Sequence, residues 1–170
     1  MTILWPNGSS TRPLVSSGFG PRNLANPLAS KYHRGTDFYG FPTVHSIADG
    51  EVVFVGWYSA VHWSPIAGFM VWVQHDGFFS RYLHNAAGTQ RVKNGDRVKA
   101  GDPLISMGWS GLTGPADSHS HVEVTPGRWH TANTGQVDPV AFISARLTAG
   151  SPAGSPEEDE DMPLNDADFE

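Results

Sequence analysis

Apolar and polar residues alternate in short runs that are separated by turn residues. Residues 50–57 form a run rich in β-branched side chains directly after Asp49, and residues 69–75 form a second run that ends at Asp76-Gly77. The run 78–83 follows that turn at once, so we expect the last two runs to pair as a β-hairpin.

Three further runs have the same character and are shorter. Residues 97–100 and 103–107 lie between glycines, and residues 118–125 alternate polar and apolar side chains. Only the stretch 139–146 has a helical pattern, one or two turns long. Strands at this spacing predict a mainly β protein, an antiparallel sheet or small sandwich with little helix.

The two ends of the chain differ from this central part. Residues 1–34 are rich in Pro, Gly and Ser and predict an irregular wrap. We divide the chain into an irregular N-terminal segment (1–15), one domain (16–147), and a Gly/Ser/Pro linker with an acidic tail that we expect to be disordered (148–170).

Composition excludes several classes of function. The 170 residues carry a formal net charge of −6, but eight of the 17 acidic residues follow position 147. The rest is slightly basic, with no basic stripe, so we expect no nucleic-acid partner. No apolar run approaches the roughly 20 residues of a membrane helix, and we expect no membrane insertion. Cysteine is absent, which excludes disulfides, thiolate nucleophiles and Cys-based metal sites.

Histidines carry the candidate chemistry. In His119-Ser120-His121-Val122-Glu123, residues two apart on a strand face the same side, so both imidazoles and the carboxylate should project together. Paired imidazoles on a rigid strand can bind a metal ion. Two of the eight histidines could also fall two apart by chance.

Two other segments add chemistry of the same kind. His33 and Asp37, with Gly35 between them, could converge through a tight loop to offer zinc an imidazole and a carboxylate. The alternative is a surface histidine and a turn aspartate. Tyr82-Leu83-His84 ends a predicted strand of the same sheet, where His84 could equally be a structural histidine.

Taken in this order and at these separations, His33-x-x-x-Asp37, Tyr82-x-His84 and His119-x-His121 resemble the lysostaphin-type (LytM-like) zinc metallopeptidases, which are peptidoglycan endopeptidases of bacterial autolysins and phage endolysins. The resemblance extends from Ser16 to Ile143. The approach to His119, residues 113–118, is longer than the usual Gly-rich turn. Ser120 and Val122 replace the usual Leu and Phe, and both should point away from the metal.

The resemblance implies the lysostaphin-type fold and one Zn²⁺ per chain, with His33, Asp37 and His121 as ligands. It implies catalytic roles for His84 and His119. We expect His119 to take a proton from water and His84 to orient water or stabilise the intermediate. A zinc ion with three protein ligands keeps a fourth position for water.

Residues around this set have two interpretations each. Glu123 could accept the second N–H of a ligand histidine, or it could be an exposed or salt-bridged carboxylate. Tyr82 could face the cleft as a donor, or it could serve packing. Trp63, Trp109 and Trp129, in predicted loops, could rim a peptide groove or fill gaps in the packing.

The expected function is hydrolysis of peptide bonds in peptidoglycan stems or cross-bridges, by a monomer, leading to cell-wall lysis. A catalytically inactive relative that binds or activates, and a small β carrier or sugar-binding domain, are the alternatives. Residues 1–20 have no signal-peptide pattern. A phage lysin that waits in the host cytoplasm for release to the wall, or a virion-associated one, would fit that pattern.

Overall fold

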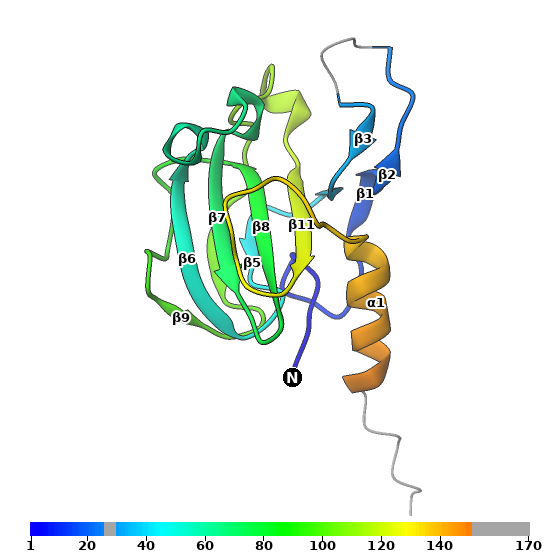
Figure 1. Cartoon of the computed structure of the whole chain (residues 1–170), viewed down its shortest axis with the longest axis vertical. Helices are drawn as coiled ribbons and strands as arrows, with labels where there is room; N and C mark the ends of the chain where they lie inside the picture. Colours follow the sequence, from blue (N-terminus) through cyan, green and yellow to red (C-terminus); the bar gives the residue numbers. More distant parts are fainter. Residues whose placement is uncertain (26–29, 151–170) are drawn as a thin grey trace, which may run out of the picture.

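An antiparallel sheet is the frame of the molecule, for which a computed structural model describes residues 1–25 and 30–150 (Figure 1). Among the described residues its strand order is β1-β4-β11-β8-β7-β6-β9. Their bounds are β1 Leu14–Ser17, β4 Thr36–Tyr39, β6 Gly50–Trp57, β7 Phe69–Gln74, β8 Phe78–Asn85, β9 Arg97–Val98 and β11 Ser120–Pro126.

Smaller elements surround this sheet. Two strand pairs lie beside it, β5 (Thr43–His45) with β10 (Pro103–Ser106) and β2 (Gly20–Pro21) with β3 (Tyr32–His33). The helical elements are the 3₁₀ turns η1 (Tyr58–Val61), η2 (Pro65–Ala67) and η3 (Pro115–Asp117) and the helix α1 (Pro139–Gly150). No helix in the described ranges is long and apolar enough to cross a membrane.

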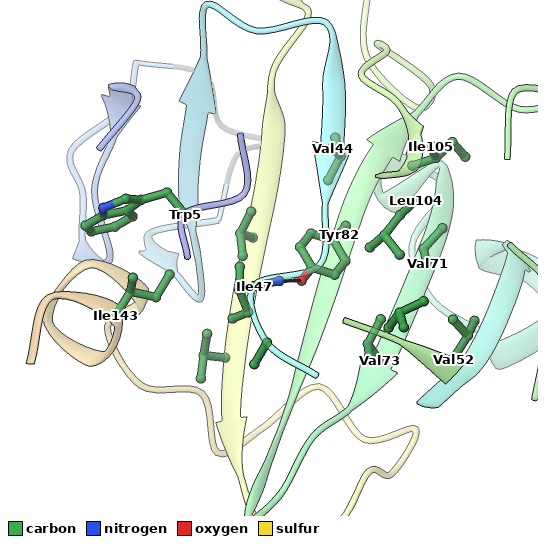
Figure 2. Packing of buried hydrophobic residues seen from close by; sticks show 14 of the residues in the cluster. Trp5, Val44, Ile47, Val52, Val71, Val73, Tyr82, Leu104, Ile105 and Ile143 are labelled. Atoms are coloured by element: carbon green, nitrogen blue, oxygen red, sulfur yellow. Dashed lines mark hydrogen bonds between the residues drawn. The ribbon is translucent and has the colours of Figure 1, made fainter. Parts of the chain in front are cut away.

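Side chains from the two faces of the sheet enter two separate apolar clusters. On β7, Val71 and Val73 belong to the large cluster, whereas Met70 and Trp72 belong to a smaller one on the opposite face. This explains the unbroken apolar run of β7, because a strand covered on both faces has no polar side. The large cluster also takes side chains from β5, β10 and α1, including Val44, Leu104, Ile105 and Ile143 (Figure 2).

The mainly β, antiparallel prediction is confirmed, and β7 and β8 form the predicted hairpin. The wrap expected for residues 1–34 is wrong in part. Three short strands lie there, because β1 pairs with β4 and β2 pairs with β3. Ile3 and Trp5 have no extended strand around them but are buried in the large cluster, so the first residues contribute to the core.

The helix is longer than the one or two turns expected. The Asp138 carboxylate accepts hydrogen bonds from the backbone N–H groups of Val140 and Ala141 at 2.8 and 3.4 Å, and Pro139 occupies the first turn. An Asp cap followed by Pro favours helix initiation. The helix continues to Gly150, past the start predicted for the linker. The remaining linker and the acidic tail, 151–170, lie outside the described residues.

Candidate metal centre

Strand register brings the first two metal-ligand candidates together. In the antiparallel pairing of β4 and β11, Asp37 is the direct partner of His121. Side chains directly opposite each other in such a pair have Cβ atoms about 5 Å apart. Backbone pairing therefore brings together two residues that are 84 positions apart in sequence, and their side chains meet on one face of the sheet.

A tight passage of the chain brings in the third candidate. His33 ends β3, and Gly35 crosses close above β11 before β4 begins at Thr36. A Cβ on Gly35 would lie 2.5 Å from the Val122 carbonyl oxygen and 2.6 Å from His121 Nε2. No side chain fits at that approach, so glycine is what lets His33 reach Asp37 and His121.

Three donor atoms converge at the resulting site. His33 Nε2, His121 Nδ1 and Asp37 Oδ1 are separated by 3.0, 2.8 and 3.1 Å in the three pairs that they form. All three residues are buried. Zinc ligands at bond lengths of about 2.0–2.1 Å and tetrahedral angles lie about 3.3 Å from one another, so a small expansion of this site would give that geometry. Among the described residues this is the cluster of His and acidic side chains that could hold a metal ion.

Both imidazoles are held in the form that can bind a metal. His33 Nδ1 lies 2.7 Å from the Gly18 carbonyl oxygen, and His121 Nε2 lies 3.3 Å from Glu123 Oε1. These oxygens only accept, so the outer ring nitrogens carry protons and the inner nitrogens are the ones available to bind a metal ion. Three electron-pair donors so close together require a cation between them, and the residues present therefore fit zinc.

The pKa values of Asp37 and His121 also indicate that this site is most stable when a positive charge is present. Burial raises the pKa of Asp37, but hydrogen bonds and charge from His121 and His33 outweigh it and hold that pKa well below its usual range. Burial lowers the pKa of His121, but Asp37 and Glu123 outweigh it and raise the value to about 9. Without a metal ion, a proton on His121 supplies the charge that these carboxylates need.

His84 joins the site through an unusual backbone conformation. It has φ +65°, which reverses the alternation of side chains at the end of β8 and turns the imidazole toward the face that carries His121. The centroids of these two rings lie 5.8 Å apart. His84 Nδ1 donates to the Ser110 carbonyl oxygen at 3.2 Å. Burial and the neighbouring imidazoles of His121 and His119 lower the pKa of His84 to about 3.

His119 lies just before β11 and borders the same site. Its ring centroid is 4.8 Å from that of His84, and its Nε2 is 3.5 Å from Asp37 Oδ1. Its Nδ1 donates to the Asp117 carbonyl oxygen at 2.7 Å, so the Nε2 lone pair faces the site. The structure thus brings all five predicted catalytic and ligand residues together.

Tyr82 does not face this site, and its proposed role as a cleft donor is wrong. It is fully buried in the large cluster, where its hydroxyl oxygen accepts from the Ile47 backbone N–H at 3.0 Å (Figure 2). Burial raises the pKa of this hydroxyl to about 12. Tyr82 and His84 are two residues apart but point to opposite faces, because the positive φ of His84 breaks the strand alternation.

Glu123 fulfils both interpretations given to it from the sequence. One carboxylate oxygen contacts His121, and the other forms an ion pair with Arg81 at 3.1 Å. Arg81 is completely buried, and the sequence analysis missed it. Its register partner on β11 is Glu123, 42 residues away, and no local pattern signals such a pairing.

The three loop tryptophans differ in exposure. Trp63 packs against Trp72 and donates from Nε1 to the Thr131 carbonyl oxygen at 2.8 Å, so it serves packing. Trp109 and Trp129 are exposed by 44% and 38%. Trp109 adjoins Ser110, whose carbonyl oxygen accepts from His84, whereas the Trp129 backbone N–H donates to Gln74 Oε1. Ser120 and Val122 are buried away from the metal face, as predicted.

Comparison of the chain with known proteins assigns it to one family. The model of peptidase family M23 matches residues 31–139, the range that holds all five site residues. ShyC, a peptidoglycan DD-endopeptidase of Vibrio cholerae serotype O1, is 36% identical over 118 residues, which are 64% of this chain and 24% of ShyC. The chain therefore spans about a quarter of the length of this curated relative.

Several solved peptidase structures have a fold similar to that of this chain. The catalytic domain of the antimicrobial peptidase lysostaphin from Staphylococcus simulans has a TM-score of 0.62 at 25% identity, over 78% of this chain and 92% of that one. A zinc-containing peptidase from Vibrio cholerae has a TM-score of 0.56 at 32% identity, over 74% of this chain and 35% of that one.

Proposed function

Because the chain belongs to peptidase family M23, we propose that it is a zinc-dependent endopeptidase that hydrolyses peptide bonds in the stem peptides or cross-bridges of peptidoglycan. The observation that carries the proposal is the convergence of His33 Nε2, Asp37 Oδ1 and His121 Nδ1 on one point, each within about 3 Å of the other two. The peptidoglycan substrate rests on the likeness to ShyC and lysostaphin.

His33, Asp37 and His121 would hold the zinc ion. When bound, zinc supplies Lewis acidity, which favours both ionisation of water and polarisation of a peptide carbonyl near neutral pH. The chain's own contribution is to hold the ligands in one tautomer, through Gly18 and Glu123, and to bury them so that the charge of the site is poorly screened.

His119 is the residue that we assign as general base. Its Nδ1–H is fixed on the Asp117 carbonyl oxygen, which leaves the Nε2 lone pair to accept a proton from the attacking water. Once protonated, the ring is stabilised by the Asp37 carboxylate 3.5 Å away. The same proton can then pass to the leaving amine.

His84 serves in its neutral form. Its low pKa, about 3, resists protonation, so the ring does not compete with His119 for the proton of water. Its Nδ1–H is used by Ser110, and Nε2 is the atom that can orient water through its lone pair. Two imidazoles in contact thus have separate tasks because their surroundings differ.

Muropeptide analysis tests the proposal. Purified peptidoglycan is incubated with the zinc-loaded protein, and the released fragments are identified by mass spectrometry, which also names the bond that is cut. The matched control is His121→Ala, which should neither keep zinc nor release fragments. Intact cross-links after incubation with a protein that holds one zinc ion per chain would favour the alternative, an inactive relative that binds or activates.

We also propose that the protein acts as a lysin on the bacterial wall, as a monomer. The likeness to the antimicrobial peptidase lysostaphin supports the lytic role. Added from outside to a suspension of susceptible bacteria, the protein should lower the turbidity, and His121→Ala should not. Cleavage of isolated peptidoglycan with no effect on any intact cell tested would contradict a lytic role while leaving the peptidase activity in place.

A further inference from the structure

The second ring nitrogen of His121 leads away from the metal centre into a buried polar chain. His121 Nε2 lies 3.3 Å from Glu123 Oε1, on the next inward-facing position of β11. The other carboxylate oxygen, Glu123 Oε2, accepts hydrogen bonds from Arg81 Nη1 and Gln136 Nε2, each at 3.1 Å. Both oxygens of Glu123 are thereby committed, and the carboxylate cannot turn without losing a partner.

Arg81 fixes that carboxylate from behind. Its side chain is fully buried, and its guanidinium carbon lies 4.5 Å from the Trp72 ring centroid and 4.7 Å from those of Trp63 and Phe79. A charge so deeply buried is stable only when it is paired. Glu123 is its acidic partner, and the aromatic faces supply further favourable electrostatic contacts.

The same guanidinium holds the segment between β11 and α1, residues 127–137, which we call the crossing loop. Arg81 Nη2 donates to the carbonyl oxygens of His130 and Ala132 at 2.6 and 2.9 Å. Trp63 donates to Thr131, and Gln136 reaches Glu123 from within the loop. The crossing loop runs in front of β8 and β7 (Figure 1), and these hydrogen bonds tie it to the buried pair.

We propose that Glu123 is the positioning residue of His121, that Arg81 holds Glu123 in place, and that the crossing loop, by closing on Arg81, keeps this support intact. The inference rests on the proposed metal-dependent function. Glu123 touches neither substrate nor metal in this account. It keeps the proton of His121 on Nε2 and the ring in one orientation, so that Nδ1 points at His33 and Asp37.

A purely structural ion pair would predict a different result. In that case, loss of the pair would lower the stability of the fold but leave the metal affinity of the folded protein unchanged. If Glu123 positions His121, loss of the pair should instead lower the zinc affinity at temperatures where the protein is still fully folded. Zinc affinity, measured by competition with a chelator, separates the two and needs no turnover.

Glu123→Gln is the first variant, because the amide keeps the shape but has one acceptor oxygen where the carboxylate has two. We expect zinc affinity to fall about 10- to 100-fold, with the folded far-UV spectrum kept. The matched control is Glu51→Gln, which removes a carboxylate of the same sheet that is paired with Arg97 at 3.1 Å on the far strands. That control should bind zinc as the unchanged protein does.

Arg81→Met/Glu123→Leu is the second variant. It removes the buried pair as a whole and leaves no uncompensated charge, and apolar replacement of buried ion pairs is often tolerated. Its zinc affinity should fall as far as that of Glu123→Gln, because the two substitutions act on one pathway. Arg81→Met alone should weaken zinc binding although Arg81 does not contact the ligand.

Affinities of Glu123→Gln and the double variant within twofold of the unchanged protein would overturn the inference and leave the proposed function standing. An unchanged protein that fails to bind zinc would overturn both. If Glu123→Gln does not fold, the folded double variant decides the matter by the same criterion, and lowered affinity there supports positioning.

Discussion

At the scale of single residues, two histidines with the same hydrogen-bond pattern have different surroundings. Both His84 and His119 give Nδ1–H to a backbone carbonyl, from Ser110 and Asp117 respectively. His84 is 5% exposed and His119 borders an ionised carboxylate, Asp37. Burial disfavours a charged imidazole, which suits His84 to act as a neutral group, whereas His119 directs its Nε2 lone pair at the site.

Removal of either imidazole should lower the rate of hydrolysis without loss of the bound zinc ion. We expect His119→Ala and His84→Ala to keep one zinc ion per chain and to lose about 100-fold or more in turnover. Elemental analysis and a peptidoglycan-release assay measure the two quantities. His62→Asn, at an exposed histidine in the left-handed region, is the control and should keep full activity. Normal turnover in both alanine variants would contradict the acid–base assignment.

His75 predicts a pH dependence of stability that is independent of the metal centre. Burial lowers its pKa to about 4, from 6.5 in the unfolded chain, so between these values the unfolded state binds more protons. Its contribution is therefore complete above pH 6.5 and is lost as the pH falls toward 4, by about 3 kcal/mol.

Denaturant unfolding across this range, with and without His75→Gln, measures the contribution. The variant removes the titrating imidazole, so its free energy of unfolding should fall less steeply below pH 6.5 than that of the unchanged protein. The difference between the two curves isolates His75 from the other groups that titrate in the same range. Parallel curves would show that His75 is not the source.

At the scale of elements, strand alternation explains which parts of the site the sequence could predict. The alternation of a regular strand predicts that His121 and Glu123 share one face, whereas the ligand set is what the family resemblance implies. The cleft-facing interpretation of Tyr82 fails, and the packing one holds, because His84 leaves the alternation at φ +65°; nothing in the sequence marks a histidine for that conformation. Arg81 was missed because its burial depends on register with Glu123 and on the crossing loop.

Substitution of Gly35 tests whether the close approach of the chain to β11, just before β4, is needed to form the site. Gly35→Ala would force its Cβ against the Val122 carbonyl oxygen and the His121 ring, so β3 and β11 must separate. We expect zinc affinity to fall at least tenfold, in line with the sensitivity of metal sites to small displacements of their supports. Gly18→Ala is the control, because a Cβ there meets nothing within 4 Å.

Both substitutions add one methyl group next to a proposed ligand, because a Cβ on Gly35 would meet His121 and the Gly18 carbonyl oxygen accepts from His33. Isothermal titration of the metal-free proteins with zinc compares them directly. Equal affinities for Gly35→Ala and Gly18→Ala would mean that the close approach of the chain does not limit the site.

At the scale of the whole molecule, the apolar core and the metal centre lie apart. The large cluster contains Trp5, Ile47, Tyr82 and Val122 and none of the proposed ligands (Figure 2). Asp37 and His121 project from the opposite face of β4 and β11, where His33 joins them from β3. The fold is therefore built without the metal, unlike small zinc modules that unfold when the ion is removed.

Removal of zinc should abolish activity and leave the protein folded. We expect the far-UV spectrum to persist after chelation. Return of zinc at 1,000 times its dissociation constant should stabilise the fold by about 4 kcal/mol, or roughly 10 °C in Tm. His121→Ala should show no such increase. Complete unfolding by the chelator would contradict a core that is independent of the site.

The central claim is that one zinc ion is held by three named atoms. Diffraction from crystals of the zinc-loaded protein, with anomalous data collected on both sides of the zinc absorption edge, tests it most directly. The account predicts a single zinc peak per chain at about 2.0–2.2 Å from His33 Nε2, Asp37 Oδ1 and His121 Nδ1. A peak bonded to other residues, or no peak there in crystals that contain zinc, would contradict it.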